Sequence, residues 1–134
     1  MDDSILISIK KMLGITDDNV DFDDALIVNI NSVFTILYQL GIGPEGGFKL
    51  EDKDTSWDEY MDESDNLESV KSYMYLKVKM LFDPPTNASL TGFYDNMIKE
   101  LEWRLTVAKE SNDLKSEELE MNEMGGDSWK MKRF

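Results

Sequence analysis

The chain has 134 residues, a length that suits one domain with a single buried core. Its 14 Lys and Arg stand against 28 Asp and Glu, and a net charge of −14 gives it no sequence-wide means of holding nucleic acid tightly. It has no Cys and no His, so disulfides, thiolate nucleophiles and the commonest general base are excluded. We therefore expect no enzyme, no metal site and no cofactor.

The first predicted helix covers residues 4–13. Ile5, Ile9 and Leu13 recur there at helical spacing, and Gly14 follows as a residue typical of helix C-termini. The residues before it are acidic where an export signal would be basic, so no export signal is expected.

A second helix is predicted to start at a capping Asp21 and to run to about Leu40. Its apolar residues occupy more than one side, which favours two partners, the domain's own core and a neighbouring subunit. The uncharged stretch 25–44 is long enough to cross a bilayer, but it holds several polar residues and no Lys or Arg flanks it. We expect no membrane span.

A glycine-rich loop at 41–47 leads into an acidic segment, residues 51–68, which holds nine acids and one lysine. Such a run is typical of a solvated surface. Ser56 and Glu59 have the spacing of a capping box and predict a short helix inside it.

The acidic segment also contains an incomplete calcium-loop pattern. Positions one, three, five, seven and twelve of such a loop fall on Asp52, Asp54, Ser56, Asp58 and Glu63. The sixth position needs glycine for its turn and carries Trp57 instead. A solvated acidic loop is therefore the favoured interpretation, and calcium binding stays the alternative.

Two longer helices follow. One is predicted from Asp65 to Phe82, where Pro84 and Pro85 end it, and the other from a capping Asn87 to about residue 110. The apolar stripe expected in the second is Leu90, Tyr94, Met97, Leu101, Leu105 and Ala108. The aromatic residues expected mostly in the core, with an interface as the alternative for some of them, are Tyr73, Tyr75, Phe93, Tyr94 and Trp103. The sequence thus predicts an all-α fold, a small bundle of about four main helices with a long acidic insertion.

The apolar content falls after residue 110, so we expect a helical domain at 1–110 and a flexible tail at 111–134 that orders on docking. The last eight residues invert the sign of the charge and interleave it with aromatic side chains, which is typical of a docking peptide. Its candidate binding residues are Trp129, Lys130, Met131, Lys132, Arg133 and Phe134. The alternative is an ordinary solvated terminus.

Two stretches carry a resemblance to a known family. The first is the corner Phe82-Asp83-Pro84-Pro85 between two helices, and the second is the helix around Glu100, Trp103 and Arg104. Together they resemble the head-to-tail connector proteins, also called adaptor or head-completion proteins, of tailed bacteriophages. The resemblance covers about residues 1–110.

The resemblance implies a virion protein of the phage neck, synthesised in the host cytoplasm. It implies a homo-oligomer, a twelvefold ring between the portal protein and the next neck or tail-completion protein, with DNA as non-specific passing cargo. In this family the C-terminal arm often reaches the portal, and residues 111–134 stand in the matching place. Strong acidity suits such a conduit, because an acidic surface does not grip DNA.

An acidic DNA mimic or inhibitor that acts in the infected cell is the alternative function. It would place carboxylates at phosphate-like spacing in the basic groove of a nuclease or repressor, and the net charge of −14 suits it equally well. It would need neither a ring nor a docking tail.

Overall fold

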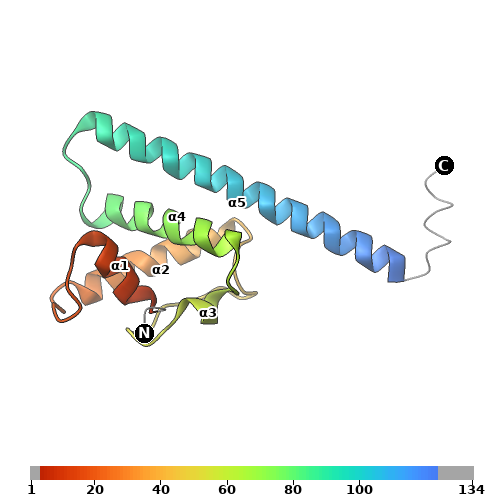
Figure 1. The fold of residues 1–134 in the computed structure, drawn as a ribbon, viewed down its shortest axis with the longest axis horizontal. Coiled ribbons are helices and arrows are strands. Elements are labelled where there is room, and N and C mark those ends of the chain that lie inside the picture. The colour runs from red at the N-terminus through yellow and green to blue at the C-terminus, as the bar shows by residue number, and fades with distance from the viewer. Residues whose placement is uncertain (1–3, 124–134) are drawn as a thin grey trace.

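The computed structural model describes residues 4–123, with side chains as far as residue 111 and at Leu114. This part of the chain forms five helices and no strand (Figure 1). The helices are α1 (Ile5–Leu13), α2 (Asp23–Gln39), α3 (Trp57–Tyr60), α4 (Asp65–Phe82) and α5 (Ala88–Glu123). Four of them are long and α3 is one turn, so the predicted small all-α bundle is confirmed.

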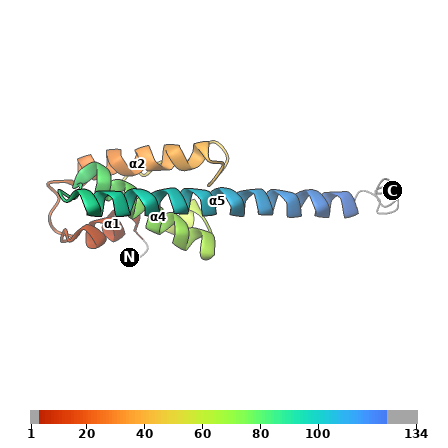
Figure 2. The same cartoon turned by 90° about the horizontal axis from the view of Figure 1, so that it is seen from above.

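Helix α4 is the centre of the bundle. It contacts α1 and α2 on one side and α5 on the other, as Figures 1 and 2 show. Its side chains Val70, Tyr73, Met74 and Val78 are completely buried. A helix that is apolar on two sides needs such partners on both, since each exposed apolar face would otherwise stay in water.

The predicted first helix is confirmed with its ends. The Ser4 side chain accepts a hydrogen bond from the Ile7 N–H at 3.2 Å, and Gly14 ends α1 with φ 82°, a conformation that favours glycine. An ion pair then ties α1 to the start of α2. Lys10 Nζ lies 2.8 Å from Asp23 Oδ1 and donates to the Asp17 carbonyl at 3.2 Å.

The predicted cap of α2 is wrong. Phe22, not Asp21, stands at the N-cap position, and no side chain bonds to the first amides. The Asp21 N–H donates instead to the Asn19 side chain at 3.1 Å. Acidic residues do occupy the first turn, where they interact favourably with the positive end of the helix dipole. No helix within residues 4–123 is both long and apolar enough to cross a membrane.

The acidic segment and Leu50, the residue before it, are fixed to the bundle by backbone hydrogen bonds. The Asn31 side chain of α2 donates to the Leu50 carbonyl at 3.0 Å and accepts from the Leu50 N–H at 2.6 Å. The Ile5 N–H donates to the Thr55 carbonyl at 3.1 Å. These bonds satisfy backbone groups that belong to no helix or sheet. They hold the chain against α1 and α2 before α3 begins.

The predicted short helix inside the acidic segment is confirmed as α3. Its capping box is complete, because the Ser56 N–H donates to Glu59 Oε2 at 2.8 Å and the Ser56 hydroxyl accepts from the Glu59 amide. Trp57 and Tyr60 then point into the bundle. Gly43 lies against the Tyr60 ring, which leaves no room for a Cβ atom there. Its φ of 101° also favours glycine.

The predicted end of the last helix at about residue 110 is too early, because α5 continues to Glu123. Figure 1 shows its C-terminal part running beyond the rest of the bundle. Eight of the thirteen residues 111–123 are Glu, Leu, Lys or Met, which are good helix formers, and extending an existing helix needs no new nucleus. A docking tail that begins at residue 111 stays a prediction.

Stability is expected to fall in alkali because Tyr60 and Tyr73 are buried. Burial raises the pKa of both phenols above the ordinary value of 10, and for Tyr73 a hydrogen bond to Glu102 at 2.7 Å adds to it. The unfolded chain releases these protons near pH 10 and the folded chain does not, so the stability present below pH 10 is lost as the pH rises. At pH 11 each phenol should cost about 1.4 kcal/mol, measured by urea unfolding.

Tyr60→Phe should flatten this pH dependence, because the variant lacks the buried phenol. The same loss of stability in alkali as in the unchanged chain would contradict the assignment.

Candidate functional site

The corner between α4 and α5 is a compact, capped turn. Asp83 ends α4 with φ −146° and ψ 69°, outside the α region that a following proline disfavours, and its carboxylate lies 3.0 Å from Lys79 Nζ. Phe82 packs edge-on against Phe22, with 5.4 Å between the ring centroids. Because two helices and the start of α2 meet here, Phe82, Asp83, Pro84 and Pro85 set the angle at which α5 leaves α4.

Asn87 starts α5 as predicted. Its Oδ1 accepts hydrogen bonds from the Ser89 and Leu90 amides at 2.8 and 3.2 Å. The Thr91 hydroxyl donates to the Pro85 carbonyl at 3.3 Å and closes the turn from the other side.

The second family-like stretch lies on the outer side of α5. Arg104 Nη2 and Glu100 Oε1 are 2.6 Å apart, and both side chains are more than half exposed. Trp103 beside them is 66% exposed. Thirteen residues of helix, about 20 Å, separate Glu100 from Asn87 at the corner. The structure therefore does not bring the two family-like stretches together in one pocket.

Part of the predicted apolar core of α5 is wrong. The buried side chains are Ile98, Leu101 and Leu105, whereas Phe93 is 56% exposed and Trp103 lies in solvent. Leu90 and Met97 are also exposed. The α5 helix has apolar residues on two faces, and only one of them can pack on α4.

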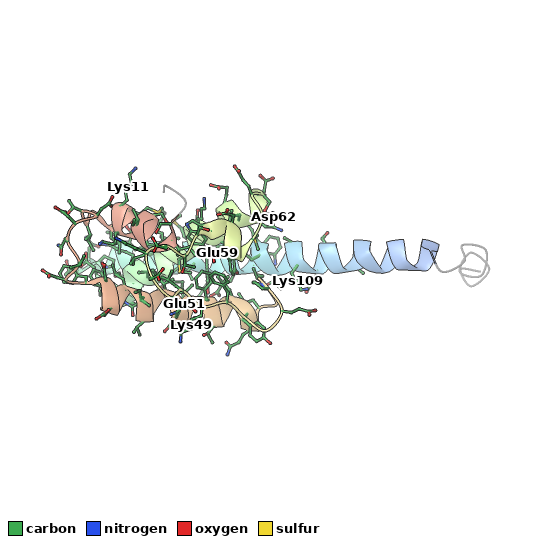
Figure 3. All side chains as sticks on the ribbon, turned by 90° about the horizontal axis from the view of Figure 1, so that it is seen from below. Lys11, Lys49, Glu51, Glu59, Asp62 and Lys109 are labelled. Atoms are coloured by element: carbon green, nitrogen blue, oxygen red, sulfur yellow. The ribbon has the colours of Figure 1, made fainter. Side chains whose placement is uncertain are left out.

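The acidic segment faces solvent as predicted. All nine of its carboxylate side chains are exposed, and Figure 3 shows Glu51, Glu59 and Asp62 on the side of the bundle that lies opposite α5. The whole segment carries a charge of −8, from nine acids and one lysine. Repulsion of polyanions is strongest there.

The calcium-loop residues are used in local turns. Asp52 Oδ1 accepts from the Asp54 N–H at 2.9 Å, Ser56 belongs to the capping box, and Trp57 is buried where a calcium loop needs glycine. Among the residues that the structure describes, no group of three acidic side chains is placed to hold a metal ion.

The candidate docking residues at the C-terminus lie outside the described residues, so Trp129, Lys130, Met131, Lys132, Arg133 and Phe134 stay a prediction.

Comparison with known proteins identifies the family. The sequence model of the phage connector proteins matches residues 5–112, which is more than half of the chain. A search of curated proteins and a search of solved structures each gave no significant match. The matched segment contains both the Asp83-Pro84-Pro85 corner and the Glu100 to Arg104 stretch, and the resemblance seen in the sequence is confirmed. The chain therefore belongs to the phage connector protein family, whose members are structural proteins of the phage neck.

Proposed function

We propose that this protein forms a ring in the neck of a tailed phage, between the portal and the tail, and that DNA passes through the ring. The observation that carries the proposal is the family match over residues 5–112. The twelvefold copy number is part of the proposal and comes from the resemblance alone.

Exposed apolar residues on α2 support contacts between neighbouring subunits. Val28 is 65% exposed and Tyr38 is 51% exposed, on the side of α2 that does not face the core. An isolated subunit leaves this apolar surface in water, and a neighbour in a ring would cover it.

The acidic segment suits a surface past which DNA slides. We propose that part of residues 51–68 faces the channel or the next ring. Carboxylates do not release counterions from phosphates, so DNA is repelled by this surface and is not held by it. The DNA-mimic alternative uses the same charge, and position in the virion separates the two.

Phage carrying Glu51→Lys, Asp62→Lys and Glu63→Lys are expected to eject DNA several-fold more slowly, because three cations would bind phosphates in the channel. These three side chains are exposed and lie outside the capping box. Ejection is measured as triggered DNA release from purified particles. Asp18→Lys, Glu45→Lys and Asp95→Lys make the same change in net charge elsewhere on the surface. Unchanged ejection in the first triple variant would contradict a channel role of this segment.

Deleting residues 124–134 is expected to abolish attachment to the portal while α1–α5 stay folded. The deleted segment contains the aromatic and basic docking residues, and the buried apolar side chains that the structure describes lie between Ile5 and Leu105. Attachment is measured by co-sedimentation with purified portal, and folding by circular dichroism. A deletion variant that binds the portal like the full chain would remove the docking role.

The direct test of the proposed function is antibody labelling of intact particles, viewed by electron microscopy. Label confined to the neck between capsid and tail supports the ring. Absence of label from particles, with the protein abundant in infected cells and its epitope accessible, would reject the neck role in favour of the DNA mimic.

A further inference from the structure

The outer face of α5 carries a regular stripe of exposed side chains. Starting at Leu90, eight positions follow one another at alternating steps of three and four residues, and all eight are exposed. We call these residues the outer stripe: Leu90, Phe93, Met97, Glu100, Arg104, Val107, Ser111 and Leu114. Steps of three and four over more than three heptads are the spacing of a seam between two paired helices.

No other element of the described chain covers the outer stripe. The residues of α5 that pack on α4, Ile98, Leu101 and Leu105, lie roughly a third of a turn away around the helix. In Figure 1 α5 lies along one edge of the bundle, and in Figure 2, seen from that edge, it lies in front of the other helices. Leu114, in the part that runs beyond the bundle, is 66% exposed. The stripe is therefore free to receive a further helix along about 36 Å of α5.

The outer stripe is complementary to itself when a second α5 lies antiparallel to it. With the two-fold axis near residue 102, each position meets a suitable partner across the seam. The facing pairs are Leu90 with Leu114, Phe93 with Ser111, Met97 with Val107, and Glu100 with Arg104. Apolar residues thus meet apolar ones, the largest side chain meets the smallest, and opposite charges meet at the centre.

A parallel pair in register lacks this complementarity. It would place Glu100 against its own copy and Arg104 against its own copy, and like charges that face one another at a seam are unfavourable. It would also place Phe93 against Phe93 and Ser111 against Ser111, which leaves one layer overfilled and another empty. The charges and the sizes favour the same orientation independently.

We propose that the free subunit forms a two-fold symmetric dimer in which the outer stripes of two copies pair antiparallel. The partner is a second copy of this chain, because the sequence of the stripe supplies both halves of every facing pair. Glu51, Glu59 and Asp62 lie on the side of the bundle opposite α5, so the dimer keeps these acids of the two copies apart (Figure 3).

Such a dimer is a form of the protein before assembly. A two-fold contact uses the same patch on both copies and closes on itself, so it cannot continue around a cyclic ring. The dimer shields Phe93, Met97 and Val107 from water. It must separate before these residues can contact another partner. This inference does not rest on the proposed function, because it concerns the purified chain alone.

Charge exchange tests the central pair. Glu100→Arg alone and Arg104→Glu alone each place like charges opposite one another twice per dimer, and each should raise the dissociation constant of the full chain at least about tenfold. The double variant restores opposite charges and should recover most of the affinity. Dissociation is measured by sedimentation equilibrium, and circular dichroism verifies that α5 stays helical.

Cysteine cross-linking tests the orientation in a chain that has no cysteine of its own. Leu90→Cys combined with Leu114→Cys should give a disulfide-linked dimer on mild oxidation. Leu114→Cys alone should not, because the two copies of residue 114 are about 36 Å apart in the antiparallel pair. Efficient linking by the single variant would overturn the proposal in favour of a parallel pair. A wild-type chain that sediments as a monomer at its highest soluble concentration would also overturn it.

Discussion

Replacing Trp57 with alanine is expected to lower the free energy of unfolding by about 3–5 kcal/mol. Trp57 is 1% exposed, and its ring meets Phe34 and Tyr60 edge-on with centroids 6.3 and 6.5 Å away. Its Nε1–H donates to the Ser8 hydroxyl of α1 at 3.0 Å. Truncation leaves a cavity and removes this hydrogen bond at the point where the acidic segment joins the bundle. Urea unfolding followed by far-ultraviolet circular dichroism measures the loss.

Trp103→Ala is the matched control, since it removes the same side chain from a position that is 66% exposed. It should change the free energy of unfolding by no more than about 0.5 kcal/mol. Similar losses at the two tryptophans would mean that Trp57 does not anchor the acidic segment. A large loss at Trp57 alone would show that α3 is part of the core.

Helix existence and several helix ends were predictable from local chemistry. The α4 end at the two prolines, the Asn87 cap and the Ser56–Glu59 capping box each depend on residues within four positions of one another. Local rules suffice there because the bonding partners are neighbours in the sequence.

The end of α5 and the sides it buries were not predictable in the same way. Low apolar content after residue 110 predicts a flexible tail, although Glu, Lys and Leu extend a helix without any core. The helical spacing of Phe93 and Trp103 predicts a place in the core or at an interface, and both are exposed in the single chain. Only the position of α4 decides which of the two apolar faces of α5 is covered, and that position is a property of the whole fold.

Sequence reasoning also missed the residues that fix the acidic segment and the α1–α2 junction. Asn31 forms hydrogen bonds with Leu50, 19 positions away, and no local sequence pattern predicts a contact over that separation. The ion pair of Lys10, in contrast, could have been predicted from the sequence. Lys10 lies four residues after Leu6 and one after Ile9, on the buried side of α1, so a charged partner was required there.

Lys10→Met is expected to lower the free energy of unfolding by about 2–3 kcal/mol. The Lys10 side chain is 2% exposed, while that of Asp23 is 23% exposed. Removing one member of a buried pair leaves the other charge without its partner, which costs about 3–5 kcal/mol in a fully buried pair, and the partial exposure of Asp23 reduces this loss. Methionine keeps the aliphatic volume, so the lost charge causes most of the effect. Urea unfolding at neutral pH measures it.

The neighbouring Lys11→Met makes the same chemical change at an exposed position and should alter stability by no more than about 0.5 kcal/mol. Adding Asp23→Asn to Lys10→Met should recover part of the loss, because the buried acid then no longer needs a cation. If the double variant is as unstable as the sum of the two single ones, the two side chains do not act as a pair. Recovery would instead show that this ion pair holds the first turn of α2 against α1, at the N-terminus that has no side-chain cap.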